Sequence, residues 1–116
     1  MGLDTYAVTN TSYNKNTKFD LAPDDKFEGI VLCGGMFSGE GSSFRGKVYD
    51  DLVEKITDVS LYQDFIPQDT VKIMYDKMVE ALELAILPDE DKEDLSILSR
   101  FFKVCVDNNY ALHGWW

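Results

Sequence analysis

Histidine and cysteine are scarce in this chain, which has one histidine and two cysteines among 116 residues. A single imidazole and two widely separated thiols, Cys33 and Cys105, match none of the ligand spacings of zinc sites. We therefore expect no metal and no cofactor, and we interpret both cysteines as small buried apolar residues in a reducing compartment. His113 is the one obvious general base. We favour a half-buried structural role for it, because titratable side chains serve structure more often than catalysis.

Basic residues are also few, with 11 lysines and arginines against 21 acidic residues and a formal net charge of −10. Residues 58–116 hold twelve of the acids and five of the bases, so the C-terminal half is the acidic half. A chain with this charge is repelled by phosphate backbones and anionic membranes, so we expect it to bind neither nucleic acid nor a membrane. A solvated surface is the ordinary explanation of such charge. A basic partner, or mimicry of nucleic acid, is the more specific explanation.

Long apolar runs are missing as well. No stretch approaches the ~20 apolar residues that a bilayer span requires. The N-terminal residues lack the basic start and the apolar stretch of a secretion signal, so we expect a cytoplasmic protein. The length of the chain predicts one domain, residues 1–116, with a core large enough to fold without disulfides.

Apolar periodicity predicts three helices. Apolar residues recur at helical spacing over about 46–57, 68–86 and 89–108. The connection between the second and third helices is short, which makes them antiparallel neighbours. Asn108 and Asn109 end the third helix, because asparagine tolerates the left-handed backbone conformation.

Three segments have the pattern of strands: an N-terminal strand over residues 3–8, the nearly continuous apolar segment 27–33 and a C-terminal strand over residues 110–116. The sequence therefore predicts an α+β fold with a small, mainly antiparallel sheet. The N-terminal strand, residues 27–33 and the C-terminal strand form this sheet, and the three helices cover one of its faces. The other face, or an edge of the sheet, is a candidate surface for self-association.

Five of the eight glycines fall between Gly34 and Gly46, between the predicted strand 27–33 and the first helix. A glycine-rich connection is costly to order and tends to persist where backbone approaches a ligand. The segment is not a P-loop, because serine rather than lysine follows Gly41. Two bases, Arg45 and Lys47, stand beside the N-terminus of the first predicted helix, which is unusual because acids are favoured there.

These features predict an anion site on the loop 34–47. Backbone N–H groups and a set of polar and basic side chains would receive a carboxylate or phosphate. The predicted ligand-binding residues are Ser38, Ser42, Ser43, Arg45 and Lys47. In the alternative interpretation, Glu40, Asp24 or Asp25 neutralise the two bases, or the helix begins later.

Aromatic residues gather at the end of the chain. A free tail with Trp115 and Trp116 would expose several hundred Å² of apolar surface, at roughly 200 Å² per ring. We therefore expect an anchored terminus, with at least one ring buried in the core and the other facing a pocket or a second subunit. Met36 and Phe37, within the glycine loop, suggest a partner contact or a lid. All four are predicted interface residues, and core packing is the alternative for each.

Three classes of function stay open. The leading one is a non-catalytic interaction module, expected to form a homodimer through its aromatic and glycine-rich surfaces. The second is a binder of a small anion, or an enzyme acting on one at loop 34–47, with His113 as its base. The third is an acidic decoy of a basic or nucleic-acid-binding partner, which requires the acids of the second and third helices to form one exposed band.

Overall fold

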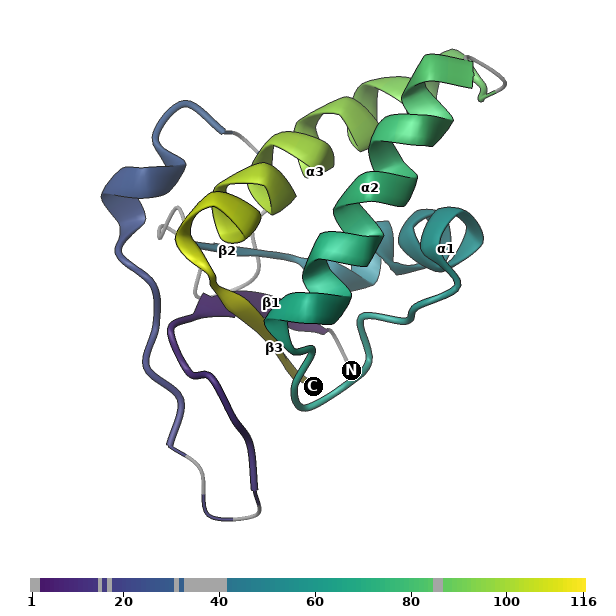
Figure 1. The fold of residues 1–116 in the computed structure, drawn as a ribbon. Coiled ribbons are helices and arrows are strands. Elements are labelled where there is room, and N and C mark those ends of the chain that lie inside the picture. Colours follow the sequence, from purple (N-terminus) through teal and green to yellow (C-terminus); the bar gives the residue numbers. More distant parts are fainter. Residues whose placement is uncertain (1–2, 15, 17, 31, 33–41, 85–86) are drawn as a thin grey trace.

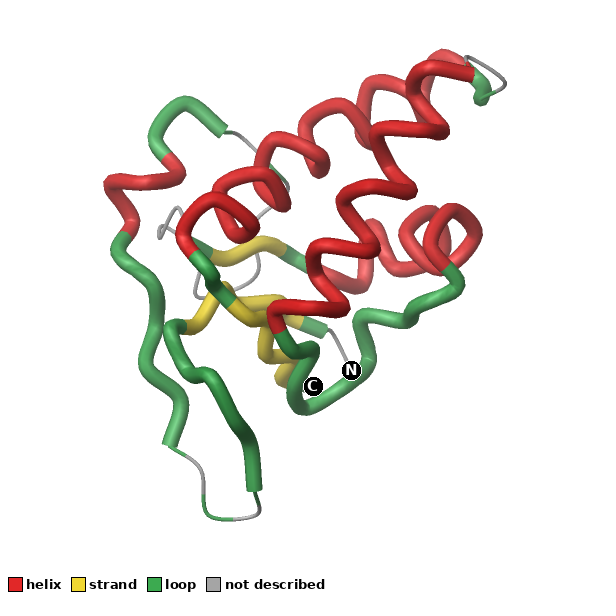
Figure 2. The backbone as a smooth tube through the Cα atoms, viewed as in Figure 1, coloured by secondary structure: helices red, strands yellow, loops and turns green. Residues whose placement is uncertain are grey.

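The structure is a computed structural model of the 116-residue chain, and it describes residues 3–14, 16, 18–30, 32, 42–84 and 87–116. The elements in chain order are β1 (Asp4–Val8), the 3-10 helix η1 (Asp24–Phe27), β2 (Ser43–Phe44), α1 (Gly46–Thr57), α2 (Gln68–Leu84), α3 (Asp89–Asn108) and β3 (Ala111–Trp115). Figure 1 shows α2 and α3 side by side above the sheet, with α1 next to them. Figure 2 shows the same arrangement by element type, with the strands beneath the helices.

The sheet has the strand order β2-β1-β3, and both pairings are antiparallel. This confirms the α+β fold with a small antiparallel sheet. The predicted helices are confirmed as well, since α1, α2 and α3 begin at the expected residues 46, 68 and 89. Asn109 ends α3 in the left-handed conformation at φ 56°, as its side chain predicts.

The strand predicted over residues 27–33 is wrong in its described part. Phe27 closes η1, and neither Ile30 nor Leu32 belongs to a strand. The second partner of β1 is instead β2, which lies beyond the glycine-rich segment. The apolar side chain of Phe27 packs on helix α3 rather than in a sheet, with its ring 4.5 Å from that of Phe101. An apolar run predicts burial but does not distinguish a strand from a packed turn.

The helix-facing side of the sheet joins a single apolar core. Phe44 of β2 is fully buried, and its ring lies 5.7 Å from Tyr49 of α1 and 4.9 Å from Phe101 of α3. Burial of one side chain of this size contributes roughly 1.5–3 kcal/mol. The same core includes Leu112 of β3 and Met74 of α2, so all three helices and the sheet share it.

The segment that connects α1 to α2 lies along the outer edge of β3. The backbone groups of Ile66 and Leu112 form two hydrogen bonds of 2.8 and 3.0 Å, and Gly114 N–H donates to Gln63 O at 3.0 Å. The buried Asp50 carboxylate of α1 accepts a hydrogen bond from Leu61 N–H at 2.7 Å. At Gly114, a Cβ would lie 2.7 Å from the backbone oxygens of this segment, so the close approach requires glycine.

Gly46 permits a second close approach, where α1 begins above β1. Lys47 N–H donates to Leu3 O at 3.2 Å, which holds the first turn of the helix against the strand. A Cβ at Gly46 would overlap Thr5 Oγ1 and would lie 2.9 Å from Leu3 Cδ2. The Thr5 hydroxyl is itself buried and has no hydrogen-bond partner among the described residues.

We expect Gly46→Ala to destabilise the protein by about 1–3 kcal/mol, because the added methyl overpacks the contact with Thr5. Helix propensity alone predicts the opposite sign, since alanine is favoured over glycine by up to about 1 kcal/mol. Thermal and urea unfolding measure the difference. Thr5→Ala makes room for the methyl, so the double variant should be more stable than the sum of the two single changes predicts. A Gly46→Ala protein as stable as the parent would contradict this packing.

Candidate functional site

One face of the sheet is turned away from the helices and carries several of the predicted site residues. Cross-strand partners share a face of a sheet. The register pairs Tyr6 with His113 and Asp4 with Trp115 across β1 and β3, and it pairs Tyr6 with Ser43 across β1 and β2. Their neighbours along β1 and β3 are buried toward the helices. We call this surface, formed by Asp4, Tyr6, Ser43, His113 and Trp115, the outer face.

Aromatic rings from two loops extend the outer face. The ring of Phe19 stacks on His113 with centroids 3.7 Å apart and an interplanar angle of 15°. Phe19 also lies near Tyr13 and Phe65, at centroid distances of 5.7 and 6.3 Å. The Tyr13 hydroxyl donates to Asp64 Oδ2 at 3.2 Å. Desolvation, together with this carboxylate, raises the pKa of the Tyr13 hydroxyl.

His113 is oriented by the backbone rather than by a carboxylate. Its Nδ1 lies 2.6 Å from the carbonyl oxygen of Asp64. A carbonyl only accepts, so Nδ1 carries the hydrogen and donates it. Asp107 lies on α3 and forms an ion pair with Lys103 at 3.0 Å, so its carboxylate does not orient the imidazole. Ring stacking and a backbone hydrogen bond are typical of a structural histidine.

We expect the neutral imidazole of His113 to be the Nδ1–H tautomer, because the Asp64 carbonyl accepts its hydrogen. Long-range ¹H–¹⁵N correlation spectra distinguish the two tautomers directly. The chain has one histidine, so the spectrum needs no assignment. Observation of the Nε2–H tautomer would show that this hydrogen bond does not form in solution.

The described residues of the predicted anion site lie in different environments. Ser42 is fully buried, and its carbonyl accepts a hydrogen bond from Ala7 N–H at 2.8 Å. Ser43 lies on the outer face, whereas Lys47 is exposed on α1. Arg45 is partly buried and precedes α1 in an extended conformation. Ser38 lies outside the described residues, as does Glu40.

Among the side chains that the structure describes, which do not include those of Asp24 and Glu40, no carboxylate pairs with Arg45 or Lys47. Among these described side chains, the one ion pair joins Lys103 to Asp107. Helix α1 also has no acidic residue in its first turn. The two bases therefore stay unmatched by described residues, although the serines around them face different directions.

Both tryptophans of the C-terminus are exposed, Trp115 by 56% and Trp116 by 49%. The expectation that at least one ring is buried in the core is therefore wrong. Gly114 fills the last inward position of β3, where backbone oxygens leave no space for a side chain. Trp116 instead packs edge-on against the exposed Tyr62, with ring centroids 5.6 Å apart. Met36 and Phe37 lie outside the described residues.

Cys105 is buried in the core, as the sequence predicts, and Cys33 lies outside the described residues. Burial raises the pKa of the Cys105 thiol well above its ordinary value. The folded state therefore holds this thiol protonated and out of contact with solvent. Such a thiol is neither a nucleophile nor a metal ligand.

We expect Cys105 to react with a thiol reagent only when the chain unfolds. In a Cys33→Ser variant, the rate of modification should follow the unfolding equilibrium as urea is added. Ionisation favours the unfolded thiol, so Cys105 should reduce stability as pH rises above the ordinary thiol pKa of 9.0. Cys105→Ala should remove that alkaline loss. Rapid modification of the native Cys33→Ser protein would contradict the burial.

The described residues contain no group of three or more histidine, cysteine or acidic side chains arranged to hold a metal ion. Within the same part of the chain, no helix combines the length and apolar character of a membrane span. Comparison with protein-family models, curated proteins and solved structures gives no match for this chain. The function must therefore be inferred from the geometry of this chain.

Sequence analysis missed the aromatic content of the outer face. Tyr6, Phe19 and Phe65 are far apart in sequence and each has an ordinary local context. Alternation along the last strand places His113 and Trp115 on one side, and this signal was available. The pairing of Tyr6 with His113 depends on the register between β1 and β3, which a single sequence does not reveal.

Proposed function

We propose that this chain is a non-catalytic interaction module that forms a homodimer through the outer face of its sheet. The observation that supports the proposal is an aromatic surface with almost no charge on a strongly acidic protein. Asp4 is the one formally charged residue in the three described strands. Helices α2 and α3, by contrast, carry ten acids and five bases. Interface centres are depleted in charge and enriched in aromatic residues.

Exposed rings on the outer face and at the end of the chain provide apolar area for association. Trp115 of the outer face is exposed by 56%, and Trp116 and Tyr62, which pack against each other, are exposed by 49% and 38%. At roughly 200 Å² per aromatic side chain, they leave about 300 Å² of largely apolar surface in water. Patches of this size on small proteins often mark contact sites. Tryptophan and tyrosine are also the residue types that most often dominate binding energy.

The arrangement of charge favours a second copy in a face-to-face orientation. Such a dimer places α2 and α3 of both subunits on its outer sides, so their acidic residues are far apart. The edge of β3 is less suitable, because Gln63 and Ile66 already occupy its hydrogen-bonding groups at Gly114 and Leu112. Association through the face leaves these bonds intact.

We expect the protein to be a dimer by light scattering across a concentration series, and Trp115→Glu to weaken it strongly. The substitution removes an aromatic anchor and places two like charges at the interface. Loss of an anchor of this type costs about 2 kcal/mol or more, which is roughly a 30-fold rise in the dissociation constant. Sedimentation equilibrium measures that constant.

Ile73→Glu is the matched control, because Ile73 on α2 is also exposed, by 53%, and the added charge is the same. This variant should dimerise like the parent. A parent protein that stays monomeric at the highest concentration, or equal weakening by both substitutions, would refute the proposed function.

A further inference from the structure

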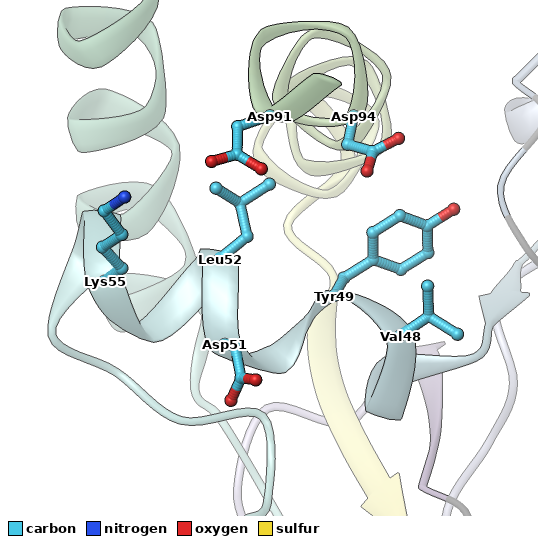
Figure 3. Close-up of a pocket in the computed structure, with 7 residues that line it drawn as sticks. All are labelled: Val48, Tyr49, Asp51, Leu52, Lys55, Asp91 and Asp94. Atoms are coloured by element: carbon cyan, nitrogen blue, oxygen red, sulfur yellow. The ribbon is translucent and has the colours of Figure 1, made fainter. Parts of the chain in front are cut away.

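A second surface lies between the helices α1 and α3. A hollow of about 240 Å³ is lined by the apolar side chains of Val48, Tyr49 and Leu52 from α1. Figure 3 shows Tyr49 and Leu52 pointing toward α3, while Asp91 and Asp94 point back from α3 toward them. Val48 is exposed by 53%. The hollow therefore combines an apolar floor with an acidic wall.

The acidic wall has no cationic partner in the described part of the chain, where Lys103 and Asp107 form the one ion pair. Asp91 and Asp94 are three positions apart on α3 and so lie on the same side of the helix. Asp91 is only partly exposed, which makes an external positive charge more favourable there than at a fully solvated carboxylate.

The acidic character continues along α1. A neighbouring hollow of about 320 Å³ shares Asp51 and Lys55 with the first and adds Glu54 and Asp58. The two hollows together present five carboxylates and a single amine. An elongated acidic track beside an apolar floor suits an extended ligand better than a single ion.

From this geometry we infer that the surface between α1 and α3 binds a basic amphipathic segment of another protein. An apolar side chain of the segment packs over Val48 and Leu52, and its flanking lysines or arginines lie beside Asp91 and Asp94. Charge complementarity accelerates the encounter, and the apolar contact supplies selectivity over other polycations. The surface is separate from the outer face, so a dimer can bind one segment on each subunit.

The test uses a fluorescein-labelled peptide of alternating lysine and leucine, and a second peptide with serine in place of every leucine. Fluorescence anisotropy should show tighter binding of the leucine peptide. Asp91→Asn with Asp94→Asn should weaken that binding about tenfold, since two exposed ion pairs are lost together. Added salt should weaken binding by the parent protein.

Glu80→Gln with Glu83→Gln is the matched control, because both residues are exposed on α2 and the change in net charge is identical. Its affinity should remain within about twofold of the parent, as expected when distant exposed charges are screened. Equal losses in the two double variants would show attraction by net charge alone and would overturn the inference.

Val48→Ser tests the apolar floor independently of the acids. The exposed position of Val48 makes the folded state insensitive to the change. The variant should weaken the leucine peptide several-fold and leave the serine peptide unchanged. Equal affinity of the parent for the two peptides, or no effect of Val48→Ser on the leucine peptide, would also overturn the inference.

Discussion

The arrangement of this fold depends on one contact, in which residues 61–66 pack along β3. Backbone hydrogen bonds hold Gln63 and Ile66 against the last strand. The carboxylate of Asp50 ties the same segment to α1. Since β3 also pairs with β1, this segment fixes α1, the sheet and the start of α2 relative to one another. Gly114 makes the contact possible, because any side chain there would meet backbone oxygens.

This contact also determines which surfaces are left for partners. It covers the edge of β3 and fills the inward position before the terminal tryptophans, so Trp115 and Trp116 remain in solvent. The outer face of the sheet thereby becomes aromatic and nearly uncharged. The acidic residues are concentrated instead on the helices, where the hollow between α1 and α3 lies. One protein thus presents two chemically different surfaces.

The helices could be predicted from sequence because their signals are local. Apolar spacing defines each helix, and Asn109 adopts the left-handed conformation that ends α3. The structure around Phe27 could not be predicted in the same way. Burial of Phe27 against Phe101 gives the same apolar pattern in the sequence as a strand does. The two-residue strand β2 is too short to have a pattern of its own. For the candidate surfaces, sequence identified Trp115 and His113, but the stacking of Phe19 on His113 depends on tertiary contacts.

The order of strands has a consequence for how the chain folds. The pairing of β1 with β3 joins residues 4–8 to residues 111–115, so it closes a loop that contains nearly all of the chain. Helices α2 and α3 contact each other across a connection of a few residues and have no such entropic barrier. During synthesis, the helical pair can therefore assemble early, while β1 waits for its partner strand until β3 has left the ribosome.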